Sequence, residues 1–217
     1  ITGKAEGHHR HKKQTGGAGQ FGEVYLRVEP MTPEEMEQKG DILDFVDETV
    51  GGSIPRQFLP AIEKGVRQAL EHGAVAGYPM EGVRVKVYDG KHHPVDSKEV
   101  AFITAGKKAF IDAVSKANPV LLEPVCHVEV SAPSTAMGDI TANLSTKRGQ
   151  VGETDYLPGE MVVIHAKVPL SEMGRYSSEL KSVTAGQGSF IMDYSHDEPT
   201  PPNIQQEIIA AYKPQDD

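Results

Sequence analysis

The most chemically versatile side chains in this sequence are its histidines, and two groups of them stand close together. Neutral imidazole is a common zinc ligand, and zinc motifs place histidines and cysteines at characteristic short spacings. The groups are His8, His9 and His11, and the adjacent pair His92 and His93. Neither has the spacing of a recognised zinc motif, and no cysteine or helical His-x-x-x-His pair accompanies them. The sequence therefore predicts no metal site, with a metal enzyme built on these histidines as the alternative.

Two further patterns could support chemistry, a group of carboxylates and a glycine-rich segment. Asp139, Glu153 and Asp155 could pair for acid–base work, but they fall on a predicted helix and turn without a nucleophile or base nearby. The segment Thr15–Gln20 could hold phosphate with its backbone N–H groups. It lacks the G-x-x-x-x-G-K-[ST] pattern, as does the rest of the chain, and a strand rather than a helix follows it. The sequence predicts neither catalysis nor nucleotide binding.

The histidine pair lies in a polar segment, Tyr88–Ser97, that regular structure should hold at both ends. Upstream, alternating valines predict a half-buried strand, Val83–Tyr88. Downstream, Asp96 and Glu99 have the spacing of a capping box and predict a helix over Ser97–Ala117. The residues predicted for its buried face are Val100, Ile103, Phe110 and Val114. A polar loop mounted in this way is typical of a contact with a partner, and an ordinary exposed connection fits the same pattern.

The composition is that of a polar globular chain with an uneven distribution of charge. It has 217 residues, 38% of them hydrophobic and 24% charged, and a formal net charge of −9. This length allows one large or two small domains, and the charge argues against a uniformly basic nucleic-acid binder. Residues 1–27 nevertheless hold five basic side chains against two acidic ones. This imbalance indicates a local RNA or phosphate contact, with a solvated charged strand as the alternative.

A segment that directs a chain to a membrane or out of the cell can be recognised in the sequence. No apolar run reaches the length of a membrane span, and no signal peptide is visible. The one cysteine, Cys126, lies in an apolar strand pattern and fits a reducing compartment, so we expect a cytoplasmic protein. The chain begins at Ile1 rather than Met, and we therefore expect a fragment or a processed chain.

The first half of the chain alternates strands and helices. A weak strand, Thr2–Gln14, the glycine-rich turn and a stronger strand, Phe21–Glu29, form a predicted hairpin. An acidic insertion, Met31–Gly40, is predicted to be a loop or a short helical turn. There follow a third strand that ends at Val50, a break at Gly51–Pro55 and a helix over Pro60–Glu71.

The second half predicts a ferredoxin-like domain. After a linker at Leu122–Pro124, the patterns come in the order βαββαβ, which folds as two helices on one face of an antiparallel sheet. The strands are predicted at Val125–Ser131, Gly149–Asp155, Met161–Val168 and Ser189–Tyr194, with helices from Ser134 and from Ser171. A last short helix, Asn203–Tyr212, carries three isoleucines on one side and must dock on another part of the chain.

Several longer motifs resemble the C-terminal third of the elongation factor G family, the GTPases of ribosomal translocation. Lys13–Gly22 resembles the family's basic, glycine-rich hairpin, Gly51–Pro55 its strand-to-helix break, and Ala76–Pro79 the approach to the tip strand. His93–Ser97 reads H-P-V-D-S where the family has H-D-V-D-S. The match continues through Pro119–Pro124, Val168–Met173 and Leu180–Gly186. Motifs of this length in this order are more specific than any one of them.

The resemblance implies an α+β fold with two domains. Residues 1–119, together with a helix at 203–212, resemble the family's fourth domain. That domain is an α/β sandwich with a left-handed βαβ crossover, like domain 2 of ribosomal protein S5, against the usual right-handed rule. Residues 120–198 resemble the fifth domain, which is ferredoxin-like, in agreement with the pattern above. The terminal helix of the family packs on the fourth domain, which would give these isoleucines a partner surface.

The resemblance also implies a mechanical role on the ribosome. In the family, the fourth domain reaches the small-subunit decoding centre, where its tip holds the tRNA–mRNA pair, and the fifth domain faces large-subunit RNA near the GTPase centre. His93 matches the family's tip histidine, and RNA is read largely by stacking and hydrogen bonds of this kind. The implied tip contacts are His93, His92, Lys91 and Pro94, with Gly16, Gly17, Gly19 and Gln20 in a second loop. The implied contacts with ribosomal RNA phosphates are Lys147, Arg148 and Lys181.

Expectations about cofactors and partners follow from the same resemblance. This chain should hold no catalytic residue, no metal and no cofactor, because GTP and magnesium bind in the N-terminal domain of a family member. The expected partner is the ribosome, and neither DNA nor a membrane is implied. We expect the chain to be a monomer.

Departures from the family pattern keep other roles open. Pro94 replaces an acid, Gly174–Tyr176 replaces a hydrophobic run, and the Met31–Gly40 insertion is longer than usual. Such differences are typical of elongation-factor-G-like paralogues that act in ribosome recycling or ribosomal protection. A small-molecule regulatory module is the alternative from outside this class, because ferredoxin-like domains serve many functions.

Overall fold

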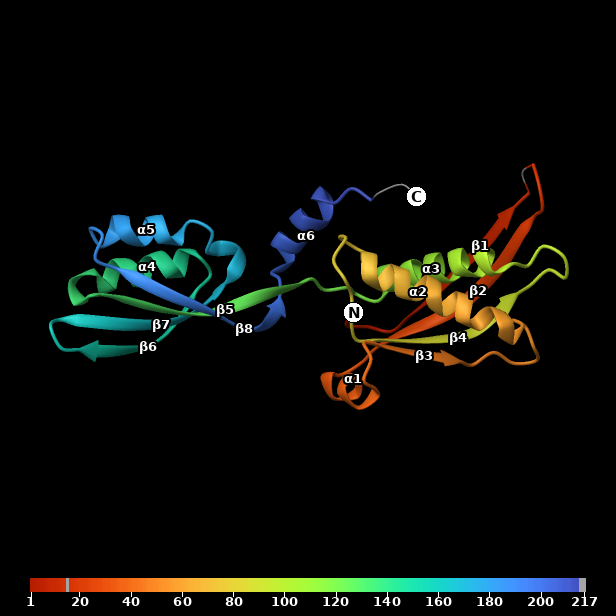
Figure 1. The fold of residues 1–217 in the computed structure, drawn as a ribbon, viewed down its shortest axis with the longest axis horizontal. Helices are drawn as coiled ribbons and strands as arrows, with labels where there is room; N and C mark the ends of the chain where they lie inside the picture. The colour runs from red at the N-terminus through yellow and green to blue at the C-terminus, as the bar shows by residue number, and fades with distance from the viewer. Residues whose placement is uncertain (15, 215–217) are drawn as a thin grey trace. The chain divides into compact units, whose positions relative to one another are not determined.

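The computed structural model describes residues 1–14 and 16–214, and these fall into two compact units (Figure 1). Unit 1 comprises Ile1–Val120 and the C-terminal segment from Pro202, and unit 2 comprises Leu121–Pro201. Thr15, which the sequence places in the glycine-rich turn, lies outside the described residues. No helix in the described ranges is long and apolar enough to cross a membrane.

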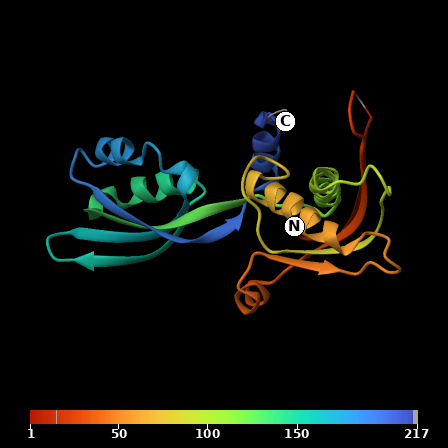
Figure 2. The same ribbon diagram turned by 45° about the vertical axis from the view of Figure 1, so that its right-hand side comes forward.

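Unit 1 is built on a four-stranded mixed sheet. The strand order is β1 (Ala5–Lys13), β2 (Gln20–Pro30), β4 (Val83–Lys91) and β3 (Leu43–Asp47). The pairs β1–β2 and β2–β4 are antiparallel, whereas β3 and β4 are parallel. The helix α2 (Leu59–His72) connects the parallel pair, and α3 (Glu99–Lys116) follows β4. Both helices cover the same face of the sheet (Figures 1 and 2).

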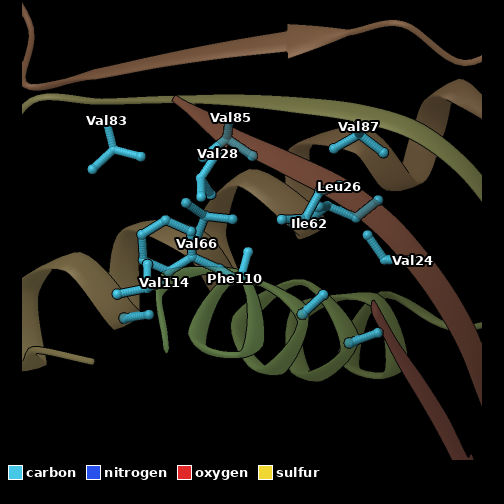
Figure 3. Close-up of a cluster of buried hydrophobic side chains, with 14 of the residues drawn as sticks. Val24, Leu26, Val28, Ile62, Val66, Val83, Val85, Val87, Phe110 and Val114 are labelled. Atoms are coloured by element: carbon cyan, nitrogen blue, oxygen red, sulfur yellow. The ribbon is translucent and has the colours of Figure 1, made fainter. Parts of the chain in front are cut away.

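The core of unit 1 forms because every second side chain of β2 and β4 points toward these helices. Val24, Leu26 and Val28 of β2 alternate with polar residues and are fully buried, as are the alternating valines of β4 (Figure 3). Phe102 and Phe110 of α3 close the cluster from the helical side. Burial of one such side chain contributes roughly 1.5–3 kcal/mol, so this alternation sets the register of the sheet.

The acidic insertion forms a helix, α1 (Pro33–Lys39), where the sequence predicted a loop or a short helical turn. Its N-terminus is a capping box: Thr32 Oγ1 accepts a hydrogen bond from Glu35 N, and the Glu35 carboxylate accepts one from Thr32 N at 2.8 Å. Pro33 at the first helical position suits this start, because proline has no N–H to satisfy.

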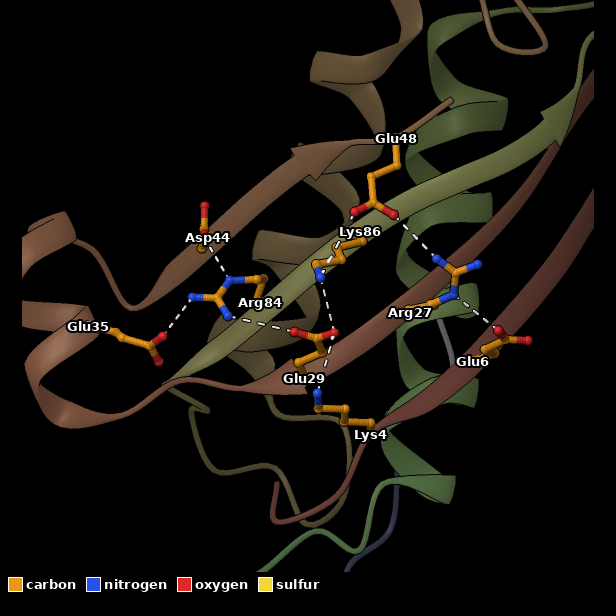
Figure 4. A network of polar contacts seen from close by, with 9 residues as sticks. All are labelled: Lys4, Glu6, Arg27, Glu29, Glu35, Asp44, Glu48, Arg84 and Lys86. Carbon is orange, nitrogen blue, oxygen red and sulfur yellow. Dashed lines mark hydrogen bonds and ion pairs between the residues drawn. The ribbon is translucent and has the colours of Figure 1, made fainter. Parts of the chain in front are cut away.

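The face of this sheet opposite the helices carries charged side chains that neutralise one another (Figure 4). Arg84 donates hydrogen bonds to Asp44 at 2.9 Å and to Glu35 at 3.1 Å, and the bond from Arg84 lowers the pKa of Asp44. Arg27 pairs with Glu6 at 3.1 Å on the same face. Most of the charge on this face is therefore used within unit 1.

Unit 2 has the predicted ferredoxin-like topology. Its order is β5 (Leu122–Pro133), α4 (Met137–Thr146), β6 (Gln150–Leu157), β7 (Met161–Pro169), α5 (Tyr176–Val183) and β8 (Ser189–Pro199). The strands lie side by side as β6-β7-β5-β8, and all neighbours are antiparallel. Both helices pack on one face, over the alternating apolar residues of β5 and β7. Cys126 belongs to this core, and burial raises the pKa of its thiol.

Some predicted boundaries of unit 1 are wrong, because contacts with distant residues determine them. Strand β4 continues to Lys91 rather than ending at Tyr88, since β2 pairs with it up to Glu23. Helix α3 begins at Glu99 with Lys98 as its N-cap and no side-chain cap, so Asp96 forms no capping box. Its predicted buried face is also wrong at one position. Val100 is exposed, and Ala101 and Phe102 point into the core instead.

Two other boundaries differ for the same reason. The third strand stops at Asp47, where its pairing with β4 ends. The predicted linker Leu122–Pro124 is the start of β5, where it pairs with β8 alone. Pairing with β7 begins only at Val125, so Pro124 is tolerated at a position with one neighbouring strand.

The last helix, α6 (Pro202–Ala211), belongs to unit 1 although it follows unit 2 in the chain. Gln205 Nε2 donates a hydrogen bond to the carbonyl oxygen of Pro119 at 3.1 Å. Tyr212 packs over Gly77, where a Cβ atom would lie 2.7 Å from its ring. The helix is held by these contacts with unit 1, which a short helix needs for stability.

Candidate functional site

Three loops lie together at one end of unit 1, and we call this end the tip (Figures 1 and 2). They are the β1–β2 connection, of which residues 14 and 16–19 are described, the β3–α2 connection around Gly51–Pro55, and the β4–α3 connection, residues 92–98. The sequence predicted the first and third as the contact loops. It treated the second only as a break between a strand and a helix.

Backbone and side-chain hydrogen bonds join the third loop to the start of β2. Phe21 N donates to Asp96 O at 2.9 Å, and Ser97 Oγ donates to Phe21 O at 3.1 Å. Phe21 and Ser97 also form a parallel β-bridge. The loop after β4 is therefore attached to the start of β2, which explains why Asp96 and Ser97 do not cap α3.

His93 is held in one orientation by its own loop. Its Nδ1 accepts hydrogen bonds from the backbone N–H groups of Val95 at 3.2 Å and Asp96 at 3.1 Å, and its backbone N donates to Ser97 Oγ at 2.7 Å. An imidazole nitrogen that accepts two such bonds carries no proton, so the proton of the neutral ring sits on Nε2. The side chain is 51% exposed, which leaves this Nε2–H available as a donor.

His93 has an aromatic neighbour in β2. The ring of Phe21 meets the ring of His93 edge-on, with centroids 6.4 Å apart. The guanidinium of Arg10 lies over the ring of Phe21, 5.4 Å from its centroid. Arg10 and His93 thus both contact the ring of Phe21, and planar side chains of this kind can stack on nucleobases.

The glycines of the hairpin have different roles. A Cβ on Gly19 would lie 2.9 Å from the carboxylate carbon of Asp96, so Gly19 allows the two loops to approach each other. Gly16 has φ +63° and Gly17 has open space around it, so neither is required by packing. The side chain of Gln20 binds His11, and Gln20 Oε1 lies 3.1 Å from His11 Nε2. The resemblance-based tip residues are therefore close together, but only Gly19 is fixed against the histidine loop.

The β3–α2 connection was missed as part of the tip. His92 Nδ1 lies 3.2 Å from the carbonyl oxygen of Ser53 and donates to it, which joins this connection to the histidine pair. Gly51 and Gly52 both have positive φ, at +68° and +69°, and this turn brings Ser53 to His92. Two consecutive glycines were the signal in the sequence, but the partner of Ser53 could not be read from them.

Positive charge remains at the tip after the ion pairs of unit 1 are accounted for. Of the five basic residues in 1–27, Lys4 and Arg27 pair with carboxylates on the open face. Arg10, Lys12 and Lys13 form no ion pair among the described residues and lie toward the hairpin end of β1. Lys91 is exposed at the end of β4. The basic residues of 1–27 without an ion pair in the described ranges therefore lie toward the tip, and their contact with RNA or phosphate stays a prediction.

The N-terminal histidines have separate partners instead of a shared ligand geometry. His8 Nε2 donates to the Glu23 carboxylate at 2.7 Å, and Glu23, 5% exposed, also accepts from the Tyr25 hydroxyl. His8 stacks on Tyr25 with centroids 4.1 Å apart. Burial lowers the pKa of His9. In the described part of the chain, these groups support β1–β2 pairing and do not converge on His92 and His93.

In unit 2, two of the three predicted phosphate contacts are engaged in ion pairs. Lys147 Nζ lies 2.8 Å from Glu179 and its side chain is 12% exposed. Arg148 binds the Glu123 carboxylate through both terminal nitrogens and Glu172 through Nε at 3.2 Å. Both therefore tie the end of α4 to neighbouring elements. Lys181 is exposed on α5 and is the better placed of the three for an external phosphate.

Comparison with known proteins gives the same two parts. Two family models match consecutively: "Elongation factor G, domain IV" over residues 1–118 and "Elongation factor G C-terminus" over residues 120–208. The elongation factor G of Salinibacter ruber is 46% identical over 96% of this chain and 29% of its own length. That of Aquifex pyrophilus is 43% identical over 97% of this chain and 29% of its own length. A crystal structure from Thermus thermophilus matches with a TM-score of 0.72 and 38% identity, covering 96% of this chain and 30% of that one.

The two matched models, in this order over an α+β unit and a ferredoxin-like unit, place the chain among the translation factors. The chain belongs to the elongation factor G family and carries its domain IV and its C-terminal domain. It spans about three tenths of the length of the relatives it matches, 29% for the first two given above.

Proposed function

We propose that this chain is the ribosome-contacting part of a translational GTPase, and that its tip enters the small-subunit decoding centre to promote movement of tRNA and mRNA. The observation that carries this proposal is the geometry of His93. Two backbone N–H groups hold its Nδ1, so the half-exposed ring presents its Nε2–H in a fixed direction beside Phe21. Such a group can donate to RNA oxygens or stack on a base without further ordering.

The distribution of charge supports the same function. Acidic residues dominate the chain as a whole, whereas Arg10, Lys12, Lys13 and Lys91 lie at the tip end of the sheet. Phosphate contacts by such residues position a protein on RNA, while stacking and hydrogen bonds to bases add specificity. GTP and magnesium would be bound by a part of the whole protein outside these residues, because this sequence contains no phosphate-loop pattern. The protein would act in the cytoplasm.

The test is a single-turnover translocation assay on the full-length protein with two substitutions of His93. His93→Ala removes both the ring and the acceptor for the Val95 and Asp96 amides. His93→Asn removes the ring but keeps a side-chain oxygen that accepts from following backbone N–H groups, as in an Asx turn. If the ring contacts RNA, both variants should slow translocation about tenfold or more, from a stacking loss of roughly 1–3 kcal/mol.

Other outcomes assign different roles. Slowing by His93→Ala alone would assign His93 to loop structure and not to RNA contact. Normal rates for both variants would refute the tip role. If the full-length protein splits ribosomes and does not translocate, this result would favour the recycling function of elongation-factor-G-like paralogues.

A lysine pair separates phosphate contact from base contact. Lys91→Ala should weaken ribosome binding broadly and flatten its salt dependence, because each phosphate contact releases counterions. Lys64→Ala, an exposed lysine in the middle of α2 and away from the tip, is the matched control. Equal salt slopes for the two variants would contradict a phosphate contact at Lys91.

A further inference from the structure

Two histidines and a glutamate meet on the open face of the sheet in unit 2. His127 and Glu129 are two residues apart on β5, so their side chains share a face, and His165 of β7 is directly across from Glu129. The neighbouring residues Val128, Val130 and Ile164 point to the opposite face, into the core. One ligand atom from each of the three polar side chains lies within 4.8 Å of the other two.

The distances between these atoms fit a single bound cation. His127 Nε2 and His165 Nδ1 are 3.4 Å apart and hydrogen-bonded, and His165 Nδ1 is 3.7 Å from Glu129 Oε1. The other ring nitrogen of His127, Nδ1, is 3.9 Å from the same carboxylate oxygen. Two nitrogens bound to one tetrahedral zinc ion at ~2.0–2.1 Å are about 3.4 Å apart, by the geometry of the tetrahedron. The two rings are stacked, with 15° between their planes, so a turn of His127 about its ring torsion would aim both lone pairs at one ion. Its side chain is 39% exposed, and the turn would replace its hydrogen bond with His165 Nδ1 by a bond to the ion.

Asp155 prepares His165 to be a ligand. His165 Nε2 lies 2.8 Å from the Asp155 carboxylate and donates to it, which leaves Nδ1 without a proton when the ring is neutral. Metal-binding histidines commonly donate their second N–H to a carboxylate in this way, which fixes the tautomer and raises the basicity of the ligand nitrogen. Asp155 comes from β6, so three adjacent strands contribute to the arrangement.

We propose that His127, Glu129 and His165 form a binding site for a divalent late transition-metal ion of the zinc class, with Asp155 as the residue that orients His165. Two imidazoles and a carboxylate suit zinc, cobalt or nickel, whereas magnesium and calcium prefer sites made of oxygen atoms. Three protein ligands leave a coordination position for water. The bound ion would connect β5, β6 and β7 on the face that the helices leave uncovered.

The charged residues that flank His127 are of both signs. Asp193 of β8 is directly across β5 from His127 and adds a further carboxylate to this face. Lys167 of β7 is across from His127 on the other side, and its exposed side chain can extend into solvent. The site could not be predicted from the sequence. Its ligands come from two strands, and the spacing of residues along the chain does not reveal how those strands pair.

The test is titration of the whole chain with Co²⁺, whose visible absorption reports coordination, followed by displacement with Zn²⁺. One ion per chain should bind at neutral pH, and Mg²⁺ should not compete. His165→Ala and His127→Gln should each abolish the cobalt spectrum, and Asp155→Asn should weaken affinity roughly 10–100-fold. His196→Ala is the matched control, because His196 is also a surface histidine bonded to a carboxylate, Glu198, but lies outside the cluster.

Folding of each variant is checked by its melting temperature without metal, and Zn²⁺ should raise that of the unsubstituted chain and of His196→Ala. Absence of cobalt binding by the unsubstituted chain would overturn the proposal. So would binding that His165→Ala and His127→Gln leave unchanged, since the ion would then sit elsewhere, as on the histidines of β1.

Discussion

Ser97 joins the His93 loop to the start of β2, and removal of its hydroxyl tests how the tip is held. Ser97 Oγ accepts a hydrogen bond from His93 N at 2.7 Å and donates one to Phe21 O at 3.1 Å. An intramolecular hydrogen bond contributes a net of about 0.5–1.5 kcal/mol to stability. Because the two bonds are exposed or partly buried, Ser97→Ala should lower the free energy of unfolding of unit 1 by about 1–2 kcal/mol.

Amide hydrogen exchange measured by NMR is the assay, because it reports unit 1 separately from unit 2. The Phe21 amide donates to Asp96 O and should exchange faster in the variant. Ser115→Ala is the matched control: Ser115 Oγ donates only to Asp112 O in the last turn of α3, so we expect a change within about 0.5 kcal/mol. If Ser97→Ala leaves Phe21 exchange and unfolding unchanged, this hydroxyl does not hold the loops together.

Three further predictions concern packing, a buried hydroxyl and acid stability. Gly65→Ala should destabilise unit 1 by about 1–3 kcal/mol or more, because a Cβ would overlap the backbone of α3. Gly138→Ala in α4, with open space around it, should be neutral or stabilising, and equal melting shifts would contradict this reasoning. Tyr176→Phe should be neutral or stabilise unit 2 by about 1 kcal/mol in urea unfolding, because its buried hydroxyl has no partner among the described residues; a clear loss would contradict this. Arg67 holds the pKa of Asp41 at about 2, so this pair should stabilise unit 1 above the usual aspartate pKa and lose that effect as pH falls toward 2. Asp41→Asn should lower the free energy of unfolding by about 1 kcal/mol at neutral pH, and the loss of stability due to this pair at low pH should disappear. If stability depends on pH in the variant as it does in the unsubstituted chain, this reasoning is refuted.

The fold could be predicted where the pattern is local. Buried valines in β5 and apolar residues in β7 alternate with polar residues over a few positions. The order of strands and helices along the chain then predicts the ferredoxin-like topology. The capping signal of Thr32 and Glu35 is equally local, although the sequence predicts only a loop or a short helical turn for Met31–Gly40.

The boundaries and contacts that failed depend on residues far apart in the chain. Strand β4 continues to the residue that pairs with Glu23. Ser97 does not start α3, because its hydroxyl donates a hydrogen bond to Phe21 O. Arg148 was expected to be free for RNA, but Glu123, which pairs with it, belongs to the start of β5 that had been read as a linker. These partners are known only once the sheet register is known, and the same is true of the cluster of His127 and His165.

The central claim is that the tip of unit 1 contacts RNA of the decoding centre. Directed hydroxyl-radical cleavage tests it, with iron tethered to a cysteine introduced into the full-length protein bound to the ribosome. Val95→Cys places the probe in the His93 loop, where Val95 is 79% exposed, and Tyr156→Cys on β6 is the control in unit 2. Cys126 is buried and should not be labelled under native conditions. We predict cleavage of decoding-centre RNA from position 95 and none there from position 156; no cleavage from position 95, or the same pattern from both, would contradict the claim.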